Sequence, residues 1–177
     1  MNDTLNSSSG GLARLNRLGS ADARAALGAV CGSARWVDEM LKRRPFASAG
    51  SLLAAADEIW FGLRKQDWLE AFSHHPRIGE RNLAQAKFAA TAEQSSREQS
   101  GMASATDAVR AEFAAGNADY ERKFGHVFLI CATGKTGDEM LDSLRERGRN
   151  DAATELRNAA NEQSKIVRIR LGKLVEA

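Results

Sequence analysis

Two of the chain's three histidines, His74 and His75, are adjacent, and Pro76 follows them directly. Imidazole is the side chain best suited to move protons near neutral pH, so this pair is a candidate for acid–base chemistry. Pro76 biases His75 towards extended backbone geometry, which restricts the orientations open to its imidazole. The alternative is a histidine at a helix C-terminus, where the helix dipole favours positive charge. Taken alone, these residues favour the alternative.

A second candidate is formed by Ser95, Glu98 and Gln99. Their spacing of three and four residues places all three on one face of a helix. A hydroxyl, a carboxylate and an amide together suit a ligand rich in amide or urea groups. A solvated helix face is the competing interpretation, and by itself it is favoured.

A third candidate is Arg170, which lies inside the apolar stripe of the last predicted helix. A buried guanidinium needs an anionic or hydrogen-bonding partner, such as an internal glutamate or a substrate carboxylate. The alternative is an arginine that extends out of the stripe to solvent. The stripe steps by three and four residues through Leu156, Ala160, Gln163, Val167, Arg170 and Leu174.

The stretch ATGKTG, which ends at Gly137, resembles part of a phosphate-binding P-loop. The P-loop pattern GxxxxGK[ST] needs an opening glycine five residues before Gly134, and Leu129 stands there. A glycine-containing turn that leads into a capped helix is therefore favoured. Cys31 and Cys131 belong to no CxxC pair, and no HExxH motif is present, so we predict no metal site.

These candidates must be positioned by helices. Alanine, leucine, glutamate and arginine dominate the chain, and strand-like alternation is nearly absent. We predict an all-α, single-domain bundle of about seven to nine helices. The apolar segment 126–132 is the exception, and it is expected to be a lone buried strand or an extended segment. Caps and apolar stripes predict helices near 20–30, 36–41, 48–63, 67–72, 91–99, 109–124, 136–148 and 151–174.

Composition narrows the function classes. The 177 residues fit one domain, and a formal net charge of +2 gives no argument for a nucleic-acid or membrane partner. No apolar run approaches the roughly 20 residues that span a bilayer. Residues 1–18 are expected to form a flexible polar tail, and 19–177 a helical domain. The chain ends in LVEA rather than a peroxisomal signal, so we expect a cytoplasmic protein.

Four motifs in order resemble one known family. They are HPRIG, SSREQSG, YERKFGHVFLICATGKT and a terminal pattern of Glu162, Lys165, Ile166, Arg170 and Leu171. Together with RRPF at 43–46, they resemble the 2-oxo-4-hydroxy-4-carboxy-5-ureidoimidazoline (OHCU) decarboxylases over roughly residues 20–175. The chain departs from the family at residues 32–35, where it has GSAR and a Glu-Ser-Pro pattern is common in the family.

The resemblance implies an all-helical, cofactor-free, commonly homodimeric enzyme of uric acid breakdown that converts OHCU to S-allantoin and CO₂. It implies that His75 and Glu98 are catalytic. A related enzyme on another ureido acid and a non-catalytic helical binding module stay open as alternatives. The implied substrate-binding residues are Pro76, Ser95, Ser96, Arg97, Gln99, Phe128, Leu129, Ile130, Cys131, Ala132 and Arg170, with backbone groups acting at 128–132.

Overall fold

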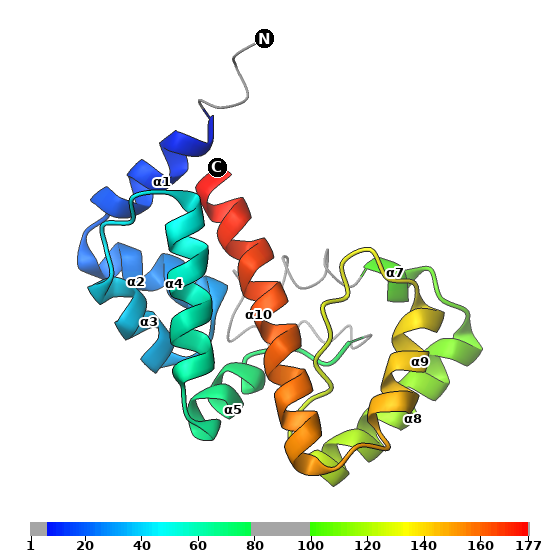
Figure 1. Cartoon of the computed structure of the whole chain (residues 1–177). Coiled ribbons are helices and arrows are strands. Elements are labelled where there is room, and N and C mark those ends of the chain that lie inside the picture. Colours follow the sequence, from blue (N-terminus) through cyan, green and yellow to red (C-terminus); the bar gives the residue numbers. More distant parts are fainter. Residues whose placement is uncertain (1–6, 79–99, 177) are drawn as a thin grey trace. The chain divides into compact units, whose positions relative to one another are not determined.

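The structure of the chain is a computed structural model that describes residues 7–78 and 100–176. The described residues form nine helices and no strand, and the helices are labelled in Figure 1. The all-α prediction and the expected number of helices are therefore confirmed for this part of the chain. The helices are α1 (Ser7–Arg17), α2 (Ser20–Val30), α3 (Ala34–Lys42), α4 (Ala49–Gly62), α5 (Lys65–Ser73), α7 (Ser100–Ala103), α8 (Asp107–Phe124), α9 (Gly137–Arg147) and α10 (Ala152–Glu176).

The chain divides into two compact units. The first contains Met1–Ala71 and Ser164–Ala177, and the second contains Phe72–Gln163. The boundaries fall within α5 and α10, so each of these helices contributes to both units.

Tryptophan side chains organise the first unit. Trp36 on α3 and Trp60 on α4 are almost completely buried. The indole N–H of Trp36 donates to the carbonyl oxygen of Ala56 at 3.1 Å, which ties α3 to α4. The indole N–H of Trp68 donates to the carbonyl oxygen of Trp60 at 2.8 Å and joins α5 to the end of α4. Burying large apolar side chains with paired indole N–H groups stabilises this unit.

The predicted flexible tail needs correction, because residues 7–17 form helix α1. Leu15 on this helix is 1% exposed. The amide of Asn16 donates to the carbonyl oxygen of Phe46 at 2.8 Å and accepts from the N–H of Phe46 at 2.9 Å. Arg44 donates to the carbonyl oxygens of Asn16 at 2.9 Å and Leu18 at 2.6 Å. The RRPF segment therefore holds the end of α1 in place.

Helices α8 and α9 form the centre of the second unit and lie side by side in Figure 1. Gly116 allows their close approach, since a Cβ atom there would lie 2.8 Å from Cδ2 of Leu144. The predicted ends are confirmed. Gly125 ends α8 with a left-handed φ of 76°, and Thr136 with Glu139 forms the capping box that starts α9.

The segment from residue 127 to residue 132 is neither helix nor strand. It connects the end of α8 to the start of α9 in Figure 1 and buries Phe128, Leu129, Ile130 and Ala132. Of the two structures that the sequence allows, the non-strand alternative is therefore found.

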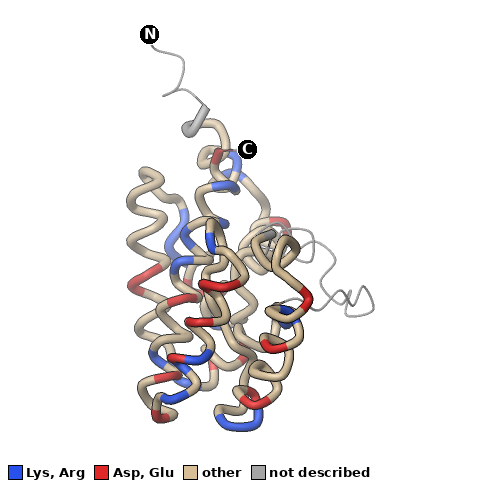
Figure 2. The backbone as a smooth tube through the Cα atoms, turned by 90° about the vertical axis from the view of Figure 1, so that its right-hand side faces the viewer, with Lys and Arg blue, Asp and Glu red and all other residues tan. Residues whose placement is uncertain are grey.

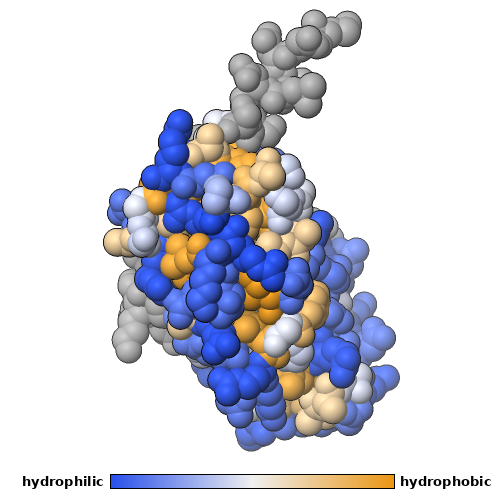
Figure 3. Space-filling view, turned by 60° about the vertical axis from the view of Figure 1, so that its left-hand side comes forward, coloured by the Kyte–Doolittle hydropathy of each residue, from blue (hydrophilic) through white to orange (hydrophobic). Residues whose placement is uncertain are grey.

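Charges of both signs are interspersed along the tube of Figure 2, in keeping with the small net charge. On the face seen in Figure 3, apolar side chains form small patches among hydrophilic ones. In the described part of the chain, no helix has the length and apolar character required to cross a membrane.

Candidate active site

The HPRI segment, residues 75–78, follows the last turn of α5. The backbone N–H of His75 donates to the carbonyl oxygen of Phe72 at 3.1 Å. Two residues later, the guanidinium of Arg77 donates to both carboxylate oxygens of Glu121 on α8, at 2.6 and 2.8 Å. Ile78 is 7% exposed and belongs to the core of the second unit. The backbone that carries the half-buried imidazole of His75 is therefore fixed on both sides.

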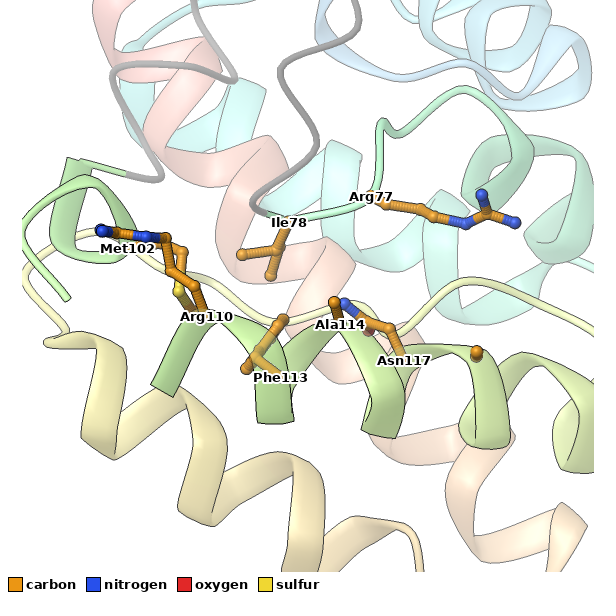
Figure 4. A pocket seen from close by; sticks show the side chains of 8 residues that line it. Arg77, Ile78, Met102, Arg110, Phe113, Ala114 and Asn117 are labelled. Carbon is orange, nitrogen blue, oxygen red and sulfur yellow. The ribbon is translucent and has the colours of Figure 1, made fainter. Parts of the chain in front are cut away.

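A cavity of about 360 Å³ lies beside this segment, between it and α8 (Figure 4). Asn117, which is 5% exposed, lines this cavity. Its side chain points towards the HPRI segment in Figure 4. The cavity is lined by Arg77, Ile78, Met102, Arg110, Phe113, Ala114, Asn117 and Ala118.

Aromatic rings hold the segment 126–132 against α8. The ring of Phe128 meets the ring of Tyr120 edge-on, with centroids 5.1 Å apart, and that of Phe113 with centroids 6.0 Å apart. The imidazole of His126 lies 5.3 Å from the ring of Phe72. These contacts bury the side chains, so the backbone of the segment is what remains for binding a polar ligand.

Two side chains form hydrogen bonds with the backbone of this segment. The guanidinium of Arg147 donates to the carbonyl oxygen of Leu129 at 2.8 Å, and the carboxylate of Glu162 accepts from the N–H of Cys131 at 2.7 Å. No hydrogen bond among the described residues involves either backbone group of Ile130. The carbonyl oxygen of Ala132 also accepts from the N–H of Lys135 at 3.0 Å. Three of the five predicted positions, Leu129, Cys131 and Ala132, are therefore held through their backbone by the protein, whereas Ile130 is not.

Arg147 is itself fixed by a buried network around Glu155. The carboxylate of Glu155 is completely buried and accepts from Arg147 at 2.6 and 2.9 Å, from Asn150 at 2.9 Å, and from the hydroxyl of Tyr120. Burial alone raises the pKa of Glu155, but these hydrogen bonds outweigh it and leave that pKa lowered. Burial, with the hydrogen bond to Glu155, raises the pKa of Tyr120, so the phenol stays a donor.

Arg170 is 5% exposed within the first unit, so its side chain does not extend to solvent. Its neighbours on the stripe, Val167 and Leu171, are also buried. The guanidinium donates to the carbonyl oxygen of Val30 at 3.4 Å. The sequence interpretation of a buried arginine is confirmed, and its role towards a substrate stays a prediction.

Five predicted residues, namely Ser95, Ser96, Arg97, Glu98 and Gln99, lie outside the described residues. The P-loop alternative loses support, because Gly134 forms a left-handed turn with φ of 78° and Thr136 caps α9. Among the described residues, no three His, Cys, Asp or Glu side chains cluster closely enough to hold a metal ion.

The sequence prediction missed Arg147 and Glu155. Arg147 is one of three arginines in RERGR and has no distinctive spacing. Glu155 does carry a signal, since it lies four residues before Ala159 and eight before Gln163, on the buried face of α10. The predicted stripe began at Leu156 instead, which is only half-buried.

Comparison with known proteins supports one family. The family model described as OHCU decarboxylase matches residues 16–172. A 2-oxo-4-hydroxy-4-carboxy-5-ureidoimidazoline decarboxylase of Amia calva is 33% identical over 136 residues, which cover 75% of each chain. A crystal structure of an OHCU decarboxylase in the presence of (S)-allantoin superposes with a TM-score of 0.72 at 34% identity, covering 85% of this chain and 96% of that one.

Longer relatives match as well. The uric acid degradation bifunctional protein TTL of Arabidopsis thaliana is 38% identical over 145 residues, or 81% of this chain and 44% of that protein. The chain therefore spans less than half the length of that relative. With the family model covering nearly the whole described fold, the chain belongs to the OHCU decarboxylase family.

Proposed function

We propose that the chain is a cofactor-independent decarboxylase of urate catabolism that converts OHCU to S-allantoin and CO₂. The observation that carries this proposal is the HPRI segment, whose backbone is fixed by Arg77 and Ile78 around the half-buried His75. Membership of the family and the unbonded backbone of Ile130 support it further.

The substrate supplies its own electron sink. The bond between the hydroxyl-bearing carbon and the carboxylate carbon breaks, and its electron pair forms a double bond to the neighbouring carbon. The electrons of the adjacent C=N bond move to nitrogen, which takes up one proton. The hydroxyl of the resulting enol then loses its proton while the neighbouring carbon gains one, which leaves a ring amide carbonyl of allantoin.

His75 is assigned the proton transfers of this sequence, as a general acid or base worth about 10²–10⁴-fold in rate. Arg170 pairs with an anionic or carbonyl oxygen of the substrate. Glu98 holds the hydroxyl or ureido N–H groups and tunes His75, while Ser95 and Gln99, next to Ser96 and Arg97, bind the ureido group. For the residues outside the described part, these roles rest on family membership alone.

The geometry of a planar trans peptide indicates how segment 128–132 contributes. The C=O of one residue and the N–H of the next point in opposite directions. Because Arg147 holds the C=O of Leu129, the N–H of Ile130 is directed away from Arg147. Because Glu162 holds the N–H of Cys131, the C=O of Ile130 is directed away from Glu162. Ile130 therefore offers one donor and one acceptor, which complement a ureido group.

Freshly generated OHCU provides the test. We expect the purified chain to accelerate its spectroscopic decay and to yield optically active allantoin. Acceleration with another ureido acid but not with OHCU favours the related-enzyme alternative. Ligand binding with no acceleration favours the non-catalytic module and contradicts the proposal.

The proposal includes a homodimer in the cytoplasm, with a small-molecule substrate and without a nucleic-acid or membrane partner. Sedimentation equilibrium tests the dimer, and fractionation of the source cells tests the location. A mass of one chain at micromolar concentration contradicts the dimer.

A further inference from the structure

Arg147 makes three kinds of contact with different parts of the second unit. Its Nε and Nη2 atoms both donate to Oε1 of Glu155 on α10, and its Nη1 atom donates to the carbonyl oxygen of Leu129. The plane of its guanidinium also lies over the ring of Phe128, 4.6 Å from the centroid. One side chain thus joins the first turn of α10 to the segment that precedes α9.

The guanidinium has little freedom to move. The side chain of Arg147 is 12% exposed and that of Glu155 is completely buried. Asn150 and Tyr120 hold the same carboxylate from two further positions in the chain. A charged pair in this environment keeps its geometry, because breaking it leaves an uncompensated buried charge.

We infer that Arg147 is a positioning residue, which sets the direction of the Ile130 N–H by fixing the peptide plane between Leu129 and Ile130. Arg147 does not touch the substrate and acts only through Leu129. The inference rests on the proposed function, since that function gives the Ile130 backbone its ligand. The ureido carbonyl of the substrate is the group that accepts a hydrogen bond from the Ile130 N–H.

The variant Arg147→Lys tests this inference. Lysine keeps the positive charge beside Glu155 but lacks the planar fork that reaches Glu155 and Leu129 together. We expect KM for OHCU to rise about tenfold, since a misdirected N–H weakens substrate binding. A variant that only loses folded protein lowers the apparent kcat and leaves KM unchanged.

The matched control is Arg145→Lys, two residues earlier on α9. Arg145 makes a comparable pair of hydrogen bonds, both to Oε1 of Glu112 on α8 at 2.5 and 2.9 Å, and does not touch segment 128–132. We expect its KM to stay within about twofold of wild type. Equal rises in KM for both variants overturn the inference, because the effect then belongs to the α8–α9 pairing.

Amide hydrogen exchange gives a readout that needs no substrate. Loss of the Leu129 anchor frees the segment, so exchange of the Cys131 N–H, which Glu162 holds, is expected to accelerate about tenfold in Arg147→Lys and not in Arg145→Lys. Wild-type exchange in a folded Arg147→Lys overturns the inference. If the wild-type chain fails to accelerate OHCU decay, the proposed function fails, and exchange still decides whether Arg147 fixes the segment.

Glu155→Gln is a second variant, which weakens the same ion pair from the carboxylate side and leaves Arg147 itself in place. Glutamine keeps an acceptor for Arg147 but removes the charge that holds the guanidinium. We expect an intermediate rise in KM and an intermediate acceleration of exchange. Wild-type values of both in this variant contradict the inference.

Discussion

His75 and His74 are neighbours with the same side chain, yet only His75 lies directly before the proline and the Arg77 anchor. We predict that His75→Asn lowers kcat for OHCU about 10²–10⁴-fold, because asparagine transfers no proton at neutral pH. His74→Ala is expected to stay within a few-fold of wild type. Initial rates, normalised to the folded fraction from circular dichroism, provide the measurement. Similar losses in both variants contradict the assignment.

Arg170 and Arg168 provide a second contrast on one helix. Arg170 is 5% exposed, whereas the side chain of Arg168 is 47% exposed and pairs with Asp57. We predict that Arg170→Met raises KM for OHCU at least about tenfold, since it removes the cation proposed to pair with a substrate oxygen. Arg168→Met is expected to change KM less than about twofold. Unchanged substrate binding in a folded Arg170→Met variant makes the buried arginine purely structural.

Single residues were predictable where their type conflicted with the local pattern. Arg170 is a charge within an apolar stripe, and that conflict is visible without a structure. Glu155 presents the same conflict at the start of α10, but the stripe was placed through Leu156, one residue away. A shift of one residue turns a helix face by about 100° and hid the buried carboxylate.

At the scale of elements, the glycine of SSREQSG has a packing role. A Cβ atom on Gly101 in α7 would lie 1.8 Å from the carbonyl oxygen of Lys135, in the turn before α9. Gly172 on α10 is the matched control, because a Cβ atom there meets no atom within 4 Å. Alanine at both positions gains helix propensity, but only at Gly101 does it meet a backbone atom. The difference in stability between the two variants therefore measures the cost of the close approach.

We predict opposite signs for the two substitutions. Gly101→Ala lowers the free energy of unfolding by about 1–3 kcal/mol, because the backbone at Lys135 must shift. Gly172→Ala raises it by up to about 1 kcal/mol through the helix propensity of alanine. Urea unfolding followed by circular dichroism measures both. A stabilised Gly101→Ala variant rules out the close approach of α7 to this turn.

Helix ends were predictable because their signals are local. Thr136 and Glu139 cap α9, Gly125 ends α8, and α3 stops at Lys42, before Pro45. Helix α1 was missed because its stability comes from elsewhere in the chain. Asn16 is held by Phe46, thirty residues later, and no spacing within a polar, glycine-containing segment reveals such a bond.

At the scale of the molecule, the site also depends on contacts between distant residues, which local sequence patterns do not reveal. The bonds that shape it join residues far apart, such as Arg77 with Glu121, Leu129 with Arg147, and Cys131 with Glu162. Family resemblance named positions 128–132 without distinguishing among them. Ile130 differs from Leu129 and Cys131 because side chains distant in the sequence hydrogen-bond to the backbone of those two residues and not to that of Ile130. Such tertiary contacts cannot be predicted from the local sequence.

At the scale of the molecule, carboxyl groups in different parts of the chain have lowered pKa values. Hydrogen bonds from Lys42 to Glu39 and from Arg43 to Glu58 lower the pKa of each glutamate. The pKa of Glu155 is also lowered, although its burial acts in the opposite sense. A carboxyl group with a lowered pKa in the folded state binds a proton more readily when unfolded.

Stability is therefore expected to be constant from pH 7 down to the ordinary carboxyl pKa near 4.5, and to fall as the pH drops below it. Each proton taken up on unfolding contributes up to about 1.4 kcal/mol per pH unit. Urea unfolding at pH 7, 5, 4 and 3 measures the slope. Glu155→Gln should flatten it, because the completely buried carboxylate no longer titrates, whereas Glu58→Gln, at a side chain 66% exposed, should leave it nearly unchanged. Stability that rises on acidification, or an equal slope in wild type and Glu155→Gln, contradicts the buried network as a source of acid sensitivity.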